Sequence, residues 1–214
     1  DAKLIVVNGH DFESWMPRLL RASGAKAPVV EATRGIEMLA AEDDHAHGDG
    51  HGHGHDHGAT DPHAWHDIEN AKIYVRNIAQ GLSEIDPAGA AVYAANAARY
   101  TAALDALAQE TAAAFEAIAK SDRRIITSHD AFGYLAQAYD LEILAASGIN
   151  TDAEPTPATL ARLIRQVKEQ KVRAVFVENI ADRRIVDQIA RETGAKVGGT
   201  LYSDALSAAS GPAP

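Results

Sequence analysis

Histidines gather in one short stretch of this chain and could coordinate a metal ion. Eight of the ten lie between Ala41 and Ala71, in AEDDHAHGDGHGHGHDHGATDPHAWHDIENA. Imidazole nitrogens bind transition metals such as Zn²⁺, commonly together with carboxylate oxygens. The question is whether these histidines form one site or belong to several different features.

Six of these histidines lie in a low-complexity segment that we place at residues 43–59. They fall within thirteen residues and alternate mostly with Gly and Asp: His45, His47, His51, His53, His55 and His57. Such a composition cannot form a core, and alternation with Gly fixes no coordination geometry. We expect a loop that binds metal weakly and at several points. It either captures, buffers or hands over metal, or it is a solvated insert without function.

Other coordinating side chains lie next to predicted regular elements. His129 follows the strand RIITS, Glu178 follows VFV, Asp204 follows GTLYS, and His63 precedes a predicted helix. In parallel sheets, ligands bind at the carboxyl ends of the strands. For each histidine alone, a surface position or a hydrogen bond in the core is the competing interpretation.

The elements that must position these residues alternate between strand and helix. The pattern predicts strands at Lys3–Asn8 and Ala27–Thr33, a helix from Phe12 that ends at Gly24, and an amphipathic helix from Ile68. A long helix is predicted from Pro87, capped by Asp86, to about Lys120, which at 1.5 Å per residue is roughly 50 Å. Beyond it, alternating strands and helices indicate a mostly parallel sheet.

The expected fold class is therefore α/β, with two lobes of mostly parallel sheets joined by one long rigid helix. We assign residues 1–86 to a partial N-terminal lobe, 87–120 to the linking helix and 121–214 to the C-terminal lobe.

Composition excludes several classes of function. The chain of 214 residues contains no cysteine, which rules out disulfides and thiolate metal ligands, and no apolar run long enough to cross a membrane. Its net charge of −10 makes nucleic acid an unsuitable partner, because phosphates would be repelled.

Five motifs occur in order along nearly the whole chain: NGHDFESWM, DPHAWHDIENA, TSHDAFGYLA, GINTDAEPT and LYSDALS. Together they resemble the metal-binding solute-binding proteins of ABC importers (the cluster A-I, or cluster 9, family), and specifically the zinc-uptake branch. The resemblance implies one metal ion in a cleft between two lobes, with His63, His129 and Asp204 among its ligands. Relatives that import manganese carry a carboxylate where His129 stands, which favours Zn²⁺ here.

The resemblance further implies capture of zinc in the periplasm or at the cell exterior and delivery to an ABC permease, without catalysis. The His-rich loop would assist acquisition, a periplasmic zinc chaperone is a further partner, and we expect a monomer. Because a ligand imidazole must be neutral, we expect affinity to fall as the pH drops through about 6.5. A zinc hydrolase with an open metal position and a surface metal-binding adhesin are the alternatives.

The chain also departs from the family pattern. Family members carry an earlier N-terminal segment with a further ligand histidine, and they continue into a final helix, so we expect both to be absent from this sequence. His10 is a weak substitute for the missing ligand. Glu178 is expected to stand behind a ligand rather than to bind metal. Asp130 is expected to cap the helix that begins near Ala131, or else to orient a ligand imidazole.

Overall fold

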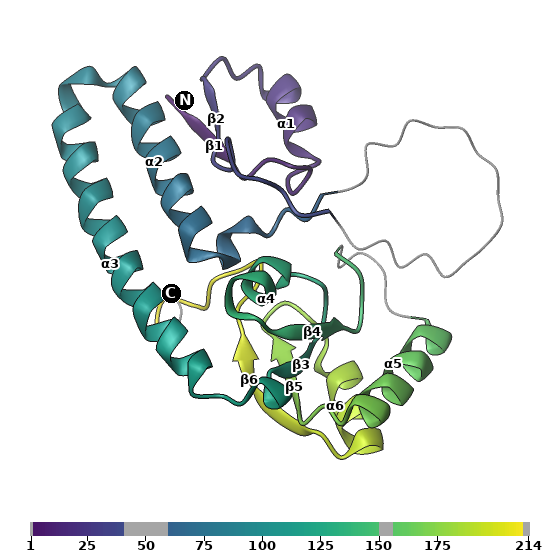
Figure 1. Ribbon diagram of the computed structural model, residues 1–214. Coiled ribbons are helices and arrows are strands. Elements are labelled where there is room, and N and C mark those ends of the chain that lie inside the picture. The colour runs from purple at the N-terminus through teal and green to yellow at the C-terminus, as the bar shows by residue number, and fades with distance from the viewer. Residues whose placement is uncertain (1, 41–59, 150–155, 212–214) are drawn as a thin grey trace. The chain divides into compact units, whose positions relative to one another are not determined.

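The computed structural model describes residues 2–40, 60–149 and 156–211, which fall into two compact units. The N-terminal unit comprises the described residues up to Ala114, and the C-terminal unit comprises those from Phe115. Each unit is a separate α/β assembly with its own parallel sheet (Figure 1). The mixed α/β class with parallel sheets and a long helix is therefore confirmed. The assignment of 1–86, 87–120 and 121–214 to lobes and linker stays a prediction.

The N-terminal unit contains a two-stranded parallel sheet in which β1 (Ile5–Val7) pairs with β2 (Val29–Glu31). Helix α1 connects the two strands but spans only Met16–Ser23. The expected start at Phe12 is wrong because Pro17 lacks an N–H and suits only the first turn of a helix. The expected end is confirmed, since Gly24 adopts the left-handed conformation with φ 65°.

Two long helices complete this unit and lie side by side in Figure 1. Helix α2 spans Ile68–Ile85, and the carboxylate of Asp67 caps it by accepting a hydrogen bond from the Glu69 amide at 2.9 Å. Helix α3 spans Ala90–Glu116. The ammonium group of Lys72 on α2 lies 2.8 Å from an Asp105 carboxylate oxygen on α3, which ties the helices together.

Helix α3 is shorter than the sequence indicated. Residues Pro87–Gly89 form a 3-10 turn capped by Asp86, so the α-helix begins only at Ala90. At the other end the backbone of Ala119 turns to φ −58° and ψ 139°, which no α-helix accommodates. Caps and turns at both ends thus remove several residues from the predicted helix.

The C-terminal unit is built on a four-stranded parallel sheet in the order β4-β3-β5-β6. Each strand is followed or preceded by a helix of the same unit (Figure 1). The strands are β3 (Arg124–Thr127), β4 (Glu142–Ala145), β5 (Ala174–Glu178) and β6 (Lys196–Leu201), and the helices are α4 (Gly133–Tyr139), α5 (Pro157–Gln170) and α6 (Arg183–Thr193).

The core of this unit lies where the sheet meets α5 and α6. Ile126, Val175, Val186 and Ile189 are each 0% exposed and belong to one cluster of buried aliphatic side chains. This packing holds the strands in place and thereby positions the residues that follow their carboxyl ends.

The strand order places a topological switch point between β3 and β5. The chain leaves β3 toward β4 on one side of the sheet and leaves β5 toward β6 on the other. Loops that diverge in this way leave a crevice beyond the carboxyl ends of the two strands, where α/β proteins bind ligands. Along the described residues, no helix combines the length and apolar character needed to cross a membrane.

Candidate metal centre

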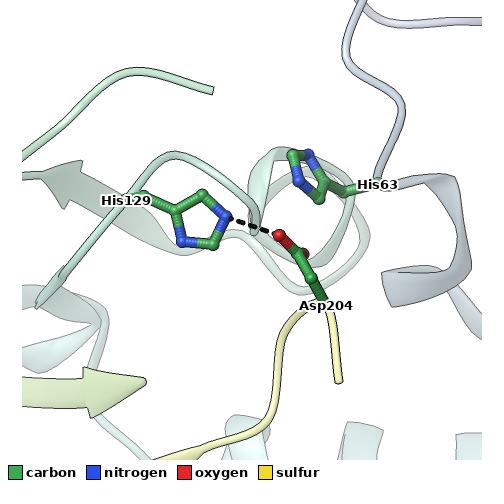
Figure 2. A group of neighbouring side chains, drawn as sticks. All are labelled: His63, His129 and Asp204. Atoms are coloured by element: carbon green, nitrogen blue, oxygen red, sulfur yellow. Dashed lines mark ion pairs between the residues drawn. The ribbon is translucent and has the colours of Figure 1, made fainter. Parts of the chain in front are cut away.

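The C-terminal unit brings His129 and Asp204 together at the carboxyl edge of its sheet. His129 lies two residues after β3 and Asp204 three residues after β6. The Nε2 atom of His129 is 3.3 Å from Oδ2 of Asp204, an ion pair that Figure 2 marks with a dashed line. The histidine is 1% exposed, and the aspartate side chain keeps 19% of its surface exposed. An imidazole nitrogen and a carboxylate oxygen therefore face each other where a ligand would bind.

Glu178, the last residue of β5, supports His129 from the opposite side of the ring. One carboxylate oxygen accepts hydrogen bonds from the backbone amides of Ser128 at 2.7 Å and His129 at 2.8 Å. The other oxygen forms an ion pair with Nδ1 of the His129 ring. The Glu178 side chain is 0% exposed, and besides the loop after β3 it contacts the Ser203 side chain, which follows β6. Glu178 thus contacts His129 through the ring nitrogen that faces away from Asp204, and its expected place behind a ligand stays a prediction.

The two carboxylates control the charge of His129. Burial alone would lower the pKa of the imidazole, but the interactions with Asp204 and Glu178 outweigh burial and raise this pKa from 6.5 to about 9. Burial would likewise raise the pKa of Glu178, yet its contacts with His129 lower it. The ring is thus protonated at neutral pH, and the expected titration near 6.5 shifts upward because two carboxylates share one buried imidazole.

In the N-terminal unit, His63 is held in a similar way by Asp61. One Asp61 carboxylate oxygen lies 2.7 Å from His63 Nδ1 and also accepts the His63 backbone amide at 2.9 Å. Both residues are buried, with 1% exposure for His63 and 4% for Asp61. The rings of Phe12 and Trp65 pack edge-on against the imidazole at centroid distances of 6.1 and 5.3 Å. The rotation of this ring is therefore fixed by neighbours of its own unit.

A polar network also fixes the backbone that carries His63. The Asn8 side chain donates to the Pro62 carbonyl at 2.9 Å and accepts from the Tyr74 hydroxyl at 2.5 Å. Asn8 directly follows β1, and Tyr74 lies on α2. The sheet and the helix of the unit thus both anchor the turn before His63.

Sequence reasoning did not find Asp61, although the signal was present. In an Asx turn, the carboxylate of an Asp accepts a hydrogen bond from the backbone amide two residues further on. The motif DPH has this spacing, and its third residue is the histidine. The carboxylate of Asp61 consequently reaches both the backbone and the ring of His63.

Other predicted residues take different places. The ring of His10 pairs with Glu31 at 3.4 Å and contacts the Thr60 hydroxyl at 3.3 Å, and neither residue is a candidate ligand. The expected cap role of Asp130 is wrong, because α4 begins only at Gly133 and Phe132 occupies its cap position. The carboxylate on Nδ1 of His129 belongs to Glu178.

The six loop histidines, from His45 to His57, lie outside the described residues. The chain on either side of the segment is described. Ala40 and Thr60 form an antiparallel bridge, and the Asp61 amide donates to the Leu39 carbonyl at 2.9 Å. Ala40 and Thr60, which flank the segment, are therefore neighbours in space, and Thr60 lies only three residues before His63.

The fold and the buried imidazole–carboxylate pairs define an α/β protein equipped with nitrogen and oxygen donors for a metal ion. A family profile described as "Zinc-uptake complex component A periplasmic" (ZnuA) matches residues 1–214. The chain belongs to this periplasmic family.

Relatives in the family carry names that mention different metals. The chain is 33% identical over 213 residues to the iron-binding protein YfeA of Yersinia pestis, covering 100% of this chain and 65% of YfeA. It is 37% identical over 200 residues to the high-affinity zinc uptake system protein ZnuA of Bacillus subtilis, covering 92% of this chain and 61% of that protein. It thus spans slightly less than two thirds of these relatives.

Solved structures show the same fold. A manganese-bound periplasmic metal binding protein from Candidatus Liberibacter asiaticus superimposes with a TM-score of 0.82 at 29% identity, covering 100% of this chain and 74% of that one. The periplasmic zinc binding protein TroA from Treponema pallidum gives a TM-score of 0.85 at 23% identity over 98% of this chain and 74% of TroA. The TroA comparison supports the fold alone.

Proposed function

We propose that this chain captures a divalent metal ion for an ABC importer, and that His63, His129 and Asp204 supply protein ligands to one tightly bound ion. The observation that carries the proposal is the buried His129 imidazole with the Asp204 carboxylate 3.3 Å from its Nε2 atom. With the pKa of the imidazole raised to about 9, this pair holds a proton at neutral pH between a nitrogen and an oxygen that are both metal donors. Replacing that proton by a divalent cation satisfies the same donors with greater charge.

We propose Zn²⁺ as the preferred ion. Two imidazoles and one carboxylate are typical zinc ligands, whereas manganese and magnesium prefer oxygen donors. The relatives are named for zinc, manganese or iron, so family membership does not identify the metal. The proposal of zinc therefore rests on the donor atoms of the three residues. Copper binds nitrogen ligands more tightly than zinc does. Discrimination against copper therefore depends on metal availability and on the coordination geometry of the site.

The proposed activity is binding and delivery rather than catalysis. The relatives are named as binding proteins and uptake components, which supports a permease as the partner of the whole protein. A periplasmic chaperone that donates zinc, and a monomeric state in solution, belong to the same proposal. The hydrolase and adhesin alternatives have no specific observation in their favour.

The experiment is a zinc titration by competition with a chelating dye. His63→Ala, His129→Ala and Asp204→Ala should each weaken the tight site by at least tenfold, since each removes one of about four donors. The matched control is His10→Asn. That histidine has φ 52°, a conformation that Asn tolerates well, and it contacts Glu31 and Thr60, neither of which is a proposed ligand. Equal affinity in all four variants would refute the proposal.

Metal preference is tested by repeating the titration with manganese, iron(II), cobalt and copper in the unaltered protein. We expect zinc to be bound more tightly than manganese by a wide margin, because both imidazoles favour zinc. Tighter binding of manganese than of zinc would contradict the assignment of the metal while leaving the ligands in place.

The role of the His-rich loop as an aid to capture is tested by replacing residues 41–59 with a short turn. The bridge between Ala40 and Thr60 makes this design feasible, because paired antiparallel residues can be joined by two to five residues. We expect the tight zinc site to persist and several weaker ions to disappear. Loss of the tight site would place the principal ligands in the segment instead.

A further inference from the structure

Two buried carboxylates hold the two candidate histidine ligands in the same manner. Asp61 accepts both the backbone amide and the ring Nδ1 of His63, at 2.9 and 2.7 Å. Glu178 accepts the backbone amide of His129 at 2.8 Å and forms an ion pair with the Nδ1 atom of its ring. In both cases one acidic side chain contacts both the backbone amide and the ring of a single histidine.

The burial of these acidic groups calls for an explanation. Exposure is 4% for Asp61 and 1% for Glu178, and a buried carboxylate is costly unless hydrogen bonds and a charged partner compensate it. Glu178 has a further partner, since it accepts the Ser128 amide at 2.7 Å and thereby joins β5 to the loop after β3. One oxygen therefore accepts the two backbone amides and the other pairs with the ring, while Ser203 is a further hydrogen-bond partner of the carboxylate.

A carboxylate on Nδ1 decides which ring nitrogen can bind a metal. A neutral imidazole carries one N–H, and a carboxylate can only accept, so the hydrogen is held on Nδ1 and the lone pair remains on Nε2. Hydrogen bonds of this kind orient the histidine ligands of metal sites and raise their basicity. In His129, Nε2 is the nitrogen that lies toward Asp204 (Figure 2).

We propose that Asp61 and Glu178 are positioning residues that fix Nε2 of His63 and Nε2 of His129 as the metal-binding nitrogens. This inference rests on the proposed function and adds to it the ligating atom of each histidine and the residues that select it. The two positioning residues occupy different kinds of local structure. Asp61 forms an Asx turn before α2, and Glu178 is the last residue of the central strand β5.

The two residues should respond differently to the loss of one oxygen. Glu178→Gln has one oxygen for the backbone amides, so its NH₂ group faces Nδ1 of His129 and forces that nitrogen to accept. The ring hydrogen then moves to Nε2 and blocks the metal. Asp61→Asn keeps the single Oδ1 atom that serves both the amide and the ring of His63, so these two contacts can persist without the charge. Zinc affinity should fall by about 10–100-fold in Glu178→Gln and less in Asp61→Asn.

The control is Glu142→Gln on β4, which removes an acidic charge from the same sheet. Glu142 is half-buried and pairs with Arg124. The zinc affinity of this variant should match the unaltered protein. A merely structural role of Glu178 would lower the unfolding midpoint in urea without changing which nitrogen binds the metal, so a direct reading of the ring nitrogens is needed.

That reading comes from nuclear magnetic resonance of the protein loaded with ¹¹³Cd²⁺ and labelled with ¹⁵N in its histidines. We expect cadmium couplings to Nε2 of both rings and slowly exchanging hydrogens on both Nδ1 atoms. In Glu178→Gln, the His129 coupling should vanish or move to Nδ1. A coupling to Nδ1 in the unaltered protein would overturn the inference, as would an unchanged spectrum and affinity in Glu178→Gln. The inference stays testable even if one variant fails to fold, because the spectrum of the unaltered protein alone can contradict it.

Failure of this inference and failure of the proposed function are distinguishable. If His129→Ala binds zinc normally, the histidine is not a ligand and the proposed function fails. If His129→Ala abolishes binding while Glu178→Gln leaves affinity and couplings unchanged, only the positioning role fails.

Discussion

Raising the pH of the metal-free protein should destabilise its C-terminal unit through His129. The pKa of this imidazole is about 9 in the folded chain, against 6.5 for an unperturbed histidine. A group whose pKa is raised by folding stabilises the native state fully below its unfolded pKa, and that stabilisation is lost as the pH rises through the folded value. A difference of about 2.5 pKa units, at 1.36 kcal/mol each, corresponds to roughly 3 kcal/mol.

The comparison variant is His129→Gln, which carries no titrating group at this position. Groups that do not contact His129 contribute equally to both proteins, so the difference between them reports on His129 together with Glu178 and Asp204, the carboxylates it pairs with. We expect the unaltered protein to lose about 3 kcal/mol more unfolding free energy than the variant over this range. A strong chelator must be present throughout, because bound metal would stabilise the native state by mass action.

The assay must report on the correct unit. Both tryptophans, Trp15 and Trp65, belong to the N-terminal unit, so tryptophan fluorescence would follow the wrong transition. The methyl groups of Ile126 and Val175 are fully buried in the C-terminal core, and their native resonances can be followed through a urea titration at each pH. An identical pH dependence in the two proteins would refute the reasoning, as would a gain of stability in the unaltered protein at pH 9.

Three further predictions use the same reasoning at other positions. Ile126→Ala should cost the C-terminal unit about 2–5 kcal/mol by opening a cavity, whereas Ile180→Ala, at a side chain 38% exposed, should cost less than about 1 kcal/mol in the same urea titration. Gly81→Ala should destabilise the N-terminal unit by about 1–2 kcal/mol despite better helix propensity, because its Cβ would lie 2.3 Å from Val30 Cγ2; tryptophan fluorescence in urea measures this. Zinc binding at pH 7.5 should release about one proton from His129, seen as a dependence of the calorimetric heat on the ionisation enthalpy of the buffer.

The C-terminal sheet could be predicted well because its pattern is local. Short apolar runs separated by amphipathic helices indicate parallel strands, and the residues after each strand then share one edge. That rule is sufficient to single out His129, Glu178 and Asp204 from the sequence. What it could not give was the strand order, which depends on how α5 crosses the sheet and which places β5 directly beside β3.

The ends of elements were harder to predict because single residues decide them. Pro17 delays α1 to Met16, and the turn at Pro87–Gly89 delays α3 to Ala90. Both prolines suit the first turn of a helix, but the turns next to them are not revealed by the periodicity of apolar residues.

The roles of the acidic residues depended on side-chain geometry that spacing does not encode. Asp130 adjoins His129 in sequence, but the carboxylate recorded on its Nδ1 comes from Glu178, which is distant in sequence and adjacent in the sheet. Asp61 could have been found from its Asx-turn spacing to His63. The buried pairing of carboxylate with imidazole, not the number of histidines, is what separates His63 from the six histidines of the loop.

The most direct test of the central claim is a crystal structure of the protein with one equivalent of zinc, measured on both sides of the zinc absorption edge. We predict a single strong anomalous peak about 2.0–2.2 Å from Nε2 of His63, Nε2 of His129 and a carboxylate oxygen of Asp204. A single peak that lies away from these three atoms, or coordinated by histidines from residues 41–59 alone, would contradict the account.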